Sequence, residues 1–423
     1  MIGAVADDFT GATDAAVAFR RAGLRTVVLF GQPSESVRTD GADVVVVGLK
    51  TRTIEPSKAV AQSLAAVDWL ERHGARRFYF KYCSTFDSRP RGNIGPVADA
   101  MAERLGADVV PMVPASPEHG RTQYLGYLFV GDVLLSDSPM RHHPLTPMTD
   151  SVIPRVLQQQ TAQAVALVRH DQVRRGGSAV VDELDRMRDR GVRYAVIDAV
   201  ETDDLATIGT AVADRILIGG GAGLAGGVAA ALVSNSRGAN DAAPEISLSS
   251  APAAALAGSC SARTLEQVGL MRASHVSYFL DAIAVPDPVE LARQALGWYD
   301  TEQPDGAPLI YSSVPPEQLA RVQAALGPGT ASRILEDAAG LIARGLVERG
   351  VRRLVVAGGE TSGAVVSALG VSGGEIGAEA APGVPWIHST EPELALLLKS
   401  GNFGEPDLLV RAVTEGQAEE VDA

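Results

Sequence analysis

The 423-residue chain has few cysteines, few aromatic residues and a deficit of basic residues. Its two cysteines, Cys83 and Cys260, stand far apart and in no CxxC pattern, which excludes a disulfide framework and a cysteine-based zinc site. Aromatic residues make up only 5% of the chain, whereas alanine and glycine are abundant. That balance suits helices packed on parallel sheets better than an all-β sandwich.

The shortage of basic residues leaves a formal net charge of −14. Such a charge argues against nucleic acid or an anionic membrane as the main partner. Any anionic substrate must therefore be held by local positive groups. We expect a small-molecule partner, and the sequence leaves the oligomeric state open, a homo-oligomer included.

Long apolar runs are also missing. The longest one, Ile216–Val233, is interrupted by glycines and is a poor membrane span. The N-terminus MIGAVADDFTG lacks a basic segment followed by an apolar one, so we expect no secretion signal. Together with the two cysteines, these absences predict a cytoplasmic protein.

Short β-branched runs alternate with amphipathic helical patterns, which is typical of βαβ units and a parallel sheet. The predicted helices include Ser57–Arg72, Ile94–Leu105 and Ser332–Arg349. The predicted strands are Ile2–Ala6, Thr26–Phe30, Val44–Val47, Arg77–Lys81, Val109–Val113, Tyr194–Asp198, Arg215–Ile218, Ala254–Ala257, Ser277–Leu280, Leu309–Ser312 and Leu354–Val356. We predict an α/β fold with two domains, each a mainly parallel sheet flanked by helices, and an active site in the interdomain cleft.

The domain division follows from the length and from one turn-rich segment. A chain of 423 residues exceeds what one hydrophobic core normally serves. The small, polar segment Ser234–Ser250 is the best linker. We place an N-terminal domain at residues 1–235, a linker at 236–250, a C-terminal domain at 251–412 and an acidic, disordered tail at 413–423.

The first candidate site follows the first strand, in the segment ADDFTGATD. In open α/β sheets ligands bind at the carboxyl ends of strands, and paired carboxylates there can accept a proton or help hold a cation. The alternative is that one aspartate only caps the next helix. Because successive strand residues point to opposite faces, we expect Asp8 to face the cleft as the proton acceptor. Asp7 then caps the helix or anchors a neighbouring loop.

A second polar loop follows the strand that ends at Lys81. Its cationic and polar side chains supply the positive charge that a substrate carboxylate needs, and the alternative is a solvated loop with surface ion pairs. The candidate substrate-binding residues here are Lys81, Ser84, Asp87, Arg89 and Asn93.

Three further features lie between this loop and the linker. Arg121 follows Gly120, and we place it with the substrate. The pair His142-His143 suggests a metal, but no third ligand stands at a typical spacing, so we expect a substrate-lining loop. Gly221–Gly226 matches GxGxxG, yet no early βαβ unit or following acidic residue supports a nicotinamide cofactor. We favour helix packing or an anion pocket there, with a dehydrogenase or a non-catalytic binding protein as the alternative.

The C-terminal half has two glycine-rich turns, AGSCS and AGGETSG, which each end a strand and open a helix. Such turns bind anions, and two in one domain suggest a nucleoside triphosphate, although either could be only a tight turn. The loop KSGNFG adds a third, and no GxxxxGK[ST] motif is present.

The segments ADDFTGATD, KYCSTFDSRPRGNIGP, GYLFVGDVLLSDSPMRHHPLTPMTD, AGSCSARTLEQV, AGGETSGAVVSALG and KSGNFGEPD resemble the four-carbon acid sugar kinase family over nearly the whole chain. The resemblance implies a sugar-acid-binding N-terminal domain, a nucleotide-binding C-terminal domain, and transfer of the ATP γ-phosphate to O4 of 3-oxo-tetronate. D-threonate and D-erythronate are the alternative substrates. It implies Mg²⁺ as a cofactor, with ligands left open, and substrate contacts at Asp7, Asp8, Lys81 and the Asp87–Arg89 loop. The implied ATP-binding residues are Ser259, Gly358, Glu360, Thr361, Ser362, Gly363, Gly401 and Asn402.

Overall fold

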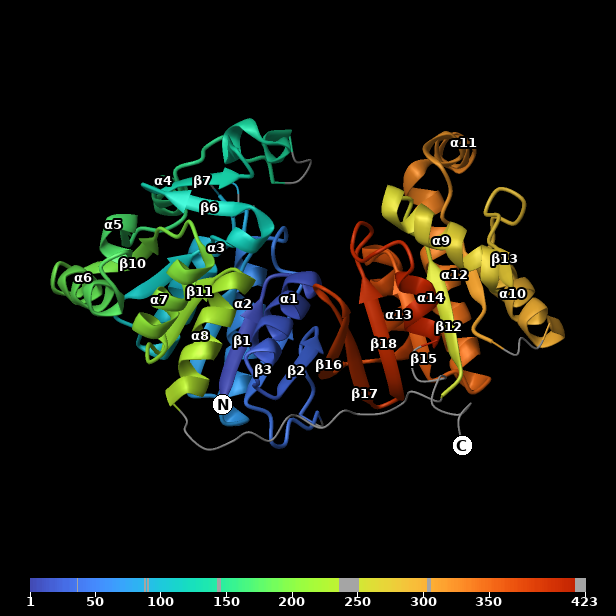
Figure 1. The fold of residues 1–423 in the computed structure, drawn as a ribbon, viewed down its shortest axis with the longest axis horizontal. Coiled ribbons are helices and arrows are strands. Elements are labelled where there is room, and N and C mark those ends of the chain that lie inside the picture. Colours follow the sequence, from blue (N-terminus) through green and yellow to red (C-terminus); the bar gives the residue numbers. More distant parts are fainter. Residues whose placement is uncertain are drawn as a thin grey trace. The chain divides into compact units, whose positions relative to one another are not determined.

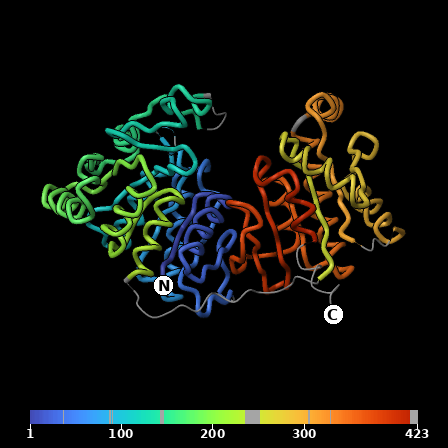
Figure 2. The backbone as a smooth tube through the Cα atoms, in the orientation of Figure 1, coloured from blue at the N-terminus to red at the C-terminus, as the bar shows by residue number. Residues whose placement is uncertain are grey.

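The computed structural model of the chain describes residues 1–414 except residues 36, 87, 88, 90, 143–145, 236–250 and 303–305. The chain divides into two compact units, Met1–Ala243 and Pro244–Ala423, which Figures 1 and 2 colour from blue to green and from yellow to red. The expected linker and residues 415–423 of the expected tail lie outside the described residues.

A parallel sheet forms the centre of the N-terminal unit. Its strand order is β2-β3-β1-β4-β11-β5-β10-β9, and every neighbouring pair is parallel. The strands are β1 (Ile2–Ala6), β2 (Thr26–Phe30), β3 (Val44–Gly48), β4 (Arg77–Lys81), β5 (Val110–Val113), β9 (Ala164–Val168), β10 (Val192–Ile197) and β11 (Leu217–Gly220).

Helices flank this sheet. They are α1 (Phe9–Arg21), α2 (Pro56–Arg72), α3 (Ile94–Leu105), α4 (Ile153–Gln158), α5 (His170–Val173), α6 (Gly177–Asp189), α7 (Thr202–Val212) and α8 (Ala222–Asn235). Helix α2 packs against α3, while α8 packs against both α1 and α7 (Figure 1). The crossovers between parallel strands require such helices, which bury the apolar faces of the sheet.

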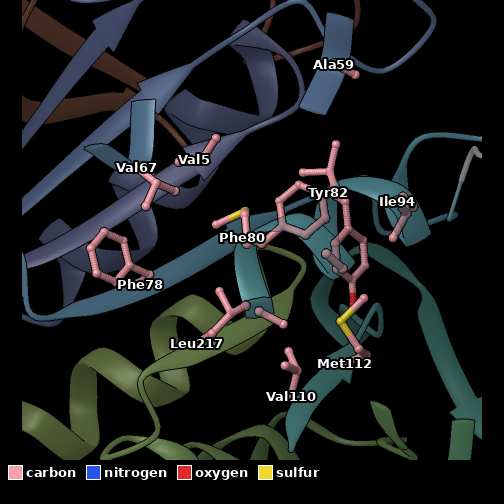
Figure 3. Packing of buried hydrophobic residues seen from close by; sticks show 14 of the residues in the cluster. Val5, Ala59, Val67, Phe78, Phe80, Tyr82, Ile94, Val110, Met112 and Leu217 are labelled. Atoms are coloured by element: carbon pink, nitrogen blue, oxygen red, sulfur yellow. The ribbon is translucent and has the colours of Figure 1, made fainter. Parts of the chain in front are cut away.

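The apolar core of this unit lies where α2 and α3 cover the sheet. Val5, Phe78 and Phe80 project from β1 and β4 towards Val67 of α2 and Ile94 of α3 (Figure 3). All five side chains are buried. Full burial of a side chain of this size contributes about 1.5–3 kcal/mol, so this layer fixes the strands whose ends carry the candidate site.

A small antiparallel sheet stands apart from the main one. It consists of β6 (Arg121–Tyr124), β7 (Tyr127–Val130) and β8 (Val133–Leu134), in the order β6-β7-β8. Three short 3₁₀ helices accompany it: η1 (Pro117–His119), η2 (Leu135–Asp137) and η3 (Pro139–His142). The buried carboxylate of Asp198 holds its first turn, since it accepts the backbone N–H groups of Leu125 and Gly126 at 2.7 and 2.9 Å.

The C-terminal unit has a mixed sheet, in the strand order β13-β14-β12-β15-β18-β17-β16. The pairs from β13 to β18 are parallel, whereas β18-β17 and β17-β16 are antiparallel. The strands are β12 (Ala253–Ala257), β13 (Ser277–Phe279), β14 (Leu309–Tyr311), β15 (Arg353–Ala357), β16 (Gly373–Ala381), β17 (Val384–Thr390) and β18 (Glu393–Lys399).

Helices also cover this sheet. They are α9 (Ala262–Ser274), α10 (Pro288–Glu302), α11 (Pro316–Leu326), α12 (Pro328–Glu348), α13 (Gly359–Leu369) and α14 (Leu408–Thr414). Helix α9 packs against α14, and α12 packs against α10, α11 and α13. The predicted α/β fold with two mainly parallel sheets is therefore confirmed. None of the helices in the described ranges is long and apolar enough to cross a membrane.

The GxGxxG segment Gly221–Gly226 leads from β11 into α8, and the glycines around it bring helices close together. A Cβ at Gly223 would lie 2.8 Å from a methyl carbon of Leu205 on α7. A Cβ at Gly209 would overlap the carbonyl of Gly227, and one at Gly227 would overlap the carbonyl of Leu205. Small residues, Gly223 of the motif among them, thus let α7 and α8 cross closely.

Candidate active site

Several strand ends meet at one edge of the N-terminal sheet. In register, Ala6 at the end of β1 pairs with Gly48 of β3 and Lys81 of β4. Gly220 of β11 pairs with Lys81 and with Val113 of β5. Because these strands are parallel neighbours, the loops that follow them leave the same edge of the sheet.

Asp7 is buried at this edge and is held by a side chain from the loop after β3. Arg52 donates from Nε to Oδ2 of Asp7 at 2.9 Å and from Nη2 to Oδ1 at 2.8 Å. The backbone oxygen of Asp7 accepts the N–H groups of Thr51 and Arg52 at 3.0 and 3.2 Å. Asp7 therefore anchors the loop that carries Arg52, with its carboxylate in a two-pronged ion pair.

Asp8 is the N-cap of α1 and remains more accessible than Asp7. Its Oδ1 accepts the backbone N–H of Gly11 at 2.7 Å and lies 3.0 Å from Nη2 of Arg52. The side chain of Asp8 is 31% exposed, against 7% for that of Asp7. Burial, followed by the negative charge of Asp7, raises the pKa of Asp8, although Arg52 and Lys81 oppose the shift. A carboxylate of raised pKa at a strand end is suited to accept a proton.

Lys81 brings a buried cation to the same place. The residue is 4% exposed, and its Nζ donates to the backbone oxygen of Tyr82 at 3.0 Å. A Cβ at Gly11 would lie 2.9 Å from this nitrogen, so the glycine leaves space for the ammonium group. Burial is also the main cause of a raised pKa at Asp14 on α1, and the positive charges of Lys81 and His119 moderate it.

Asn93 holds the Arg52 loop in place. Its Nδ2 donates to the backbone oxygens of Thr51 at 2.6 Å and Ile54 at 2.9 Å, and the residue is buried. The amide nitrogen of Asn93 is therefore hydrogen-bonded to backbone oxygens of this loop. Asn93 therefore affects the Asp7–Arg52 pair indirectly, because it holds the loop that carries Arg52.

The other sequence-predicted residues of this unit are spread more widely. Ser84 is half-buried and lies near Gly221, while Arg89 is exposed. Arg121 donates from Nη1 to the backbone oxygen of His119, and its buried Nε has no hydrogen-bond partner among the described residues. Asp87 and His143, and the side chain of His142, lie outside the described part of the chain.

A second edge is formed in the C-terminal unit by the parallel neighbours β12, β15 and β18. The backbone N–H groups of Gly258 and Ser259 donate to Ala357, and that of Gly358 donates to Lys399. The three turns after these strands therefore lie together. They contain Ser259, Gly358 and Gly401, which the family resemblance implies as ATP-binding residues.

Glycine is required at each of these turns for a local reason. A Cβ at Gly258 would overlap the hydroxyl oxygen of Thr361, and one at Gly401 would lie 2.6 Å from Oγ of Ser259. Gly358 has φ +131°, which side-chain-bearing residues rarely adopt. Such close approach leaves backbone N–H groups accessible at the start of α13, where an anion binds well.

The first turn of α13 carries the remaining ATP candidates. Glu360 is exposed, Thr361 and Gly363 are half-buried, and Ser362 is buried. The hydroxyl of Ser362 has no hydrogen-bond partner among the described residues. Asn402 is exposed in the loop after β18.

A cavity of about 540 Å³ opens beside these turns within the C-terminal unit. Its lining includes the apolar side chains of Phe279, Ile283 and Leu335, and also Gly258 and Thr361 from the glycine turns. Binding pockets for small organic ligands commonly have volumes of about 300–1,000 Å³ and combine apolar walls with a few polar groups. This shape suits a nucleoside whose phosphates point towards the glycine turns.

Among the described residues, no group of three or more His, Cys, Asp or Glu side chains could hold a metal ion. One carboxyl pair does line the cavity, formed by Glu336 of α12 and Glu360 of α13. Burial, and then the charge of Glu360, raises the pKa of Glu336. Since Mg²⁺ is usually held by one or two carboxylates and by substrate phosphates, this pair fits such an ion.

Sequence reasoning missed several residues of these two edges. Arg52 and Asp14 follow or face strand ends, and the strand-end rule that selected Asp7 and Lys81 could have found Arg52 in the segment after Val44–Val47. The cavity residue Phe279 is the last residue of β13, so the strand-end rule could have found it as well. Lys399 directly precedes a glycine-rich turn, and that local pattern does not indicate that the lysine is buried.

Comparison with known proteins gives the same two-part organisation. A family model described as a sugar-binding N-terminal domain matches residues 2–228, and one described as a nucleotide-binding C-terminal domain matches residues 254–409. A Burkholderia multivorans protein named 3-oxo-tetronate kinase is 47% identical over 98% of this chain and 96% of its own. The protein of the same name from Pseudomonas fluorescens is 47% identical over 99% of this chain and 98% of its own.

Solved structures agree with this similarity. A Salmonella typhimurium LT2 protein put forward as a tRNA synthase matches with a TM-score of 0.90 and 40% identity, over 97% of this chain and 98% of its own. A Haemophilus influenzae protein matches with a TM-score of 0.87 and 40% identity over the same shares.

Proposed function

Because the chain belongs to the four-carbon acid sugar kinase family, we propose that it transfers the γ-phosphoryl group of ATP to O4 of 3-oxo-tetronate, giving 3-oxo-tetronate 4-phosphate and ADP. The observation that carries the proposal is the identity of 47%, over 98% of this chain, to a protein of that name. The chemistry of the two strand edges is consistent with it, since one gathers carboxylates and a buried lysine and the other gathers glycine turns beside a cavity.

The N-terminal edge is proposed to hold the four-carbon acid. Lys81 supplies a buried cation for the substrate carboxylate, and Arg89 and Arg121 are the further candidates on this side. Ser84 and Asp87 are proposed to hydrogen-bond the substrate hydroxyl groups. Asn93 acts on the site through the Arg52 loop, because its amide is bonded to that loop.

Asp8 is proposed to accept the proton of the O4 hydroxyl. The O4 oxygen attacks the γ-phosphorus, and the bond between this phosphorus and the β–γ bridging oxygen breaks. The electrons of the broken bond leave with ADP, and the hydroxyl proton goes to the Asp8 carboxylate. Asp7 keeps Arg52 in place and thus holds one positive charge beside Asp8.

The C-terminal unit is proposed to bind ATP. The nucleoside occupies the 540 Å³ cavity, and the phosphates lie against the turns of Ser259, Gly358 and Gly401. Backbone N–H groups of Glu360 and Thr361 at the start of α13 donate to the phosphates. The backbone N–H of Ser362 is already bonded to Gly358, so Ser362 would contribute its unpaired hydroxyl, with Gly363 and Asn402 bordering the phosphates. Glu336 and Glu360 would hold Mg²⁺, which neutralises phosphate charge when it is bound.

The test is a coupled assay of ADP release with the full-length chain, ATP and Mg²⁺. The acids compared are D-threonate, D-erythronate and 3-oxo-tetronate generated in situ by a dehydrogenase. We expect the highest kcat/KM with 3-oxo-tetronate and a product phosphorylated at carbon 4 by ³¹P-coupled NMR. A reaction without acid measures background hydrolysis of ATP.

A higher kcat/KM with D-threonate or D-erythronate would change the proposed substrate but leave the proposed kinase activity in place. Phosphorylation of none of the three acids would contradict the proposal. Stabilisation by NAD but not by ATP–Mg²⁺ in a thermal shift experiment would favour the dehydrogenase alternative.

A further inference from the structure

Lys399, the last residue of β18, is a buried cation with all its donors in use. The residue is 1% exposed. Its Nζ lies 3.0 Å from Oγ1 of Thr264, 2.5 Å from Oε1 of Gln267 and 3.0 Å from the backbone oxygen of Gly401. A lysine ammonium has three N–H donors, so these three acceptors leave none for a ligand.

The partners of Lys399 are themselves bonded to the loop that follows it. The hydroxyl of Thr264 donates to the backbone oxygen of Gly401 at 2.8 Å. The amide nitrogen of Gln267 donates to the backbone oxygens of Phe403 at 3.1 Å and Glu405 at 2.8 Å. Both side chains belong to α9 and are fully buried. Lys399, Thr264 and Gln267 therefore form one polar network that ties the segment 401–405 to α9.

This network determines how closely the loop approaches the start of α9. Gly401 lies so near that a Cβ there would stand 2.6 Å from Oγ of Ser259 and 2.9 Å from Oγ of Ser261. Ser261 caps α9, since its Oγ accepts the backbone N–H of Thr264 at 3.3 Å. Release of Gly401 would therefore disturb two of the three turns that gather at this edge.

We infer that Lys399 is a positioning residue of the kinase reaction: it fixes the Gly401 turn against Ser259 and so shapes the seat of the ATP phosphates without touching them. The inference rests on the proposed function, because that function places phosphates at these turns. Burial in this setting lowers the pKa of Lys399 to about 8, and the positive charge of Arg263 adds to the shift. A cation held in this way by neutral oxygens costs free energy of desolvation, which the network offsets only while it is complete.

The main test is the variant Lys399→Met, which keeps the length of the side chain and removes its three donors. Calorimetry would measure the Kd of ADP and of adenosine. We expect the Kd of ADP to rise about tenfold or more, as loss of hydrogen bonds to a charged group implies, with the Kd of adenosine changed less than about twofold. Lys58→Met, at an exposed position of α2, is the matched control and should bind both like the wild type.

A pair of variants at Thr264 separates positioning from direct contact. Thr264→Val removes the acceptor for Lys399 and the donor to Gly401 but leaves the lysine charge, whereas Thr264→Ser keeps the hydroxyl. We expect Thr264→Val to reproduce the ADP-selective loss, Thr264→Ser to spare it, and the Lys399→Met/Thr264→Val double variant to be little worse than either single one.

Three results would overturn the inference. They are unchanged ADP affinity in Lys399→Met, equal losses for ADP and adenosine in that variant, or a Thr264→Val variant that binds ADP as the wild type does. Binding of neither ADP nor adenosine by the wild type would instead contradict the proposed function. The KM values provide a second readout, because the KM for ATP should rise in Lys399→Met while that for the four-carbon acid stays constant.

Discussion

Arg52 binds Asp7 through two hydrogen bonds, at 2.9 and 2.8 Å, and the same guanidinium group reaches to 3.0 Å from Asp8. The two adjacent aspartates thus share one cation but differ in their other contacts. Asp7 is enclosed by the Arg52 loop, whereas Asp8 caps α1 and keeps accessible surface. This asymmetry gives the two carboxylates separable roles.

Replacement of each aspartate by asparagine should therefore have different effects. Asp8→Asn keeps the helix cap, because asparagine caps as well as aspartate, but it removes the proton acceptor. Its kcat should fall by on the order of 10²–10⁴ with a normal melting temperature. Asp7→Asn should cost about 1–3 kcal/mol of stability, because an amide N–H₂ group replaces one of the two oxygens that accept from Arg52, which keeps Asp8 as its other carboxylate partner. Urea unfolding and steady-state kinetics of both variants would check this, and a stable but inactive Asp7→Asn would reverse the roles.

The raised pKa of Asp8 predicts an acid limb in the pH profile. Burial and the charge of Asp7 favour the protonated carboxyl, so kcat/KM should fall, as pH decreases, with a midpoint above 3.8, the ordinary value of an aspartate. The limb should be absent from the residual activity of Asp8→Asn. An unaltered limb in that variant would assign it to another group, for example Asp14, whose pKa burial also raises.

Lys81→Met tests the capture of the substrate carboxylate. A charge-assisted hydrogen bond contributes about 1.5–3 kcal/mol, so the Kd of the four-carbon acid should rise roughly ten- to hundred-fold. The affinity for ADP, measured by calorimetry on the same sample, should stay at the wild-type value. Unchanged acid affinity in Lys81→Met, in Arg89→Met and in Arg121→Met would exclude all three as the carboxylate site.

The glycine at the end of β12 offers a steric test of the ATP side. In Gly258→Ala the new methyl group would overlap the Thr361 hydroxyl, so the KM for ATP should rise several-fold or more. Gly269→Ala, on the exposed side of α9 with no atom within 4 Å of the new Cβ, is the control. An effect on the KM of the acid alone would show that ATP phosphates do not lie at this turn.

The sequence predicted most of the parallel strands because they are short, buried, apolar runs, whereas β9 and β18, which also pair in parallel, were not predicted. Ile2–Ala6, Thr26–Phe30 and Arg77–Lys81 agree with β1, β2 and β4. The antiparallel strands β16 and β17 were not predicted, because a segment such as GGEIGAEAA holds a single β-branched residue, Ile376, and lacks clear alternation. Helix α12 begins at Pro328, four residues before the predicted start at Ser332, since a proline in the first turn suits a helix.

Site residues could be predicted where they stand at or directly after the end of a predicted strand. Contacts between segments that are distant in the sequence could not be predicted. Asp7 and Lys81 could be selected from local pattern alone. The bond between Arg52 and Asp7 spans 45 positions, and that between Lys399 and Gln267 spans 132. Contacts of that kind depend on strand order and register, which no local pattern of charge or hydropathy specifies.

The deep burial of Lys81 has a kinetic consequence for an anionic substrate. Because only 4% of the residue is exposed, an approaching acid meets the field of a chain with net charge −14 before it meets this cation. Added salt screens that repulsion over about 10 Å at 0.1 M. Moderate ionic strength should therefore accelerate the encounter of the acid with the protein, whereas an attractive funnel of surface cations would make salt slow it.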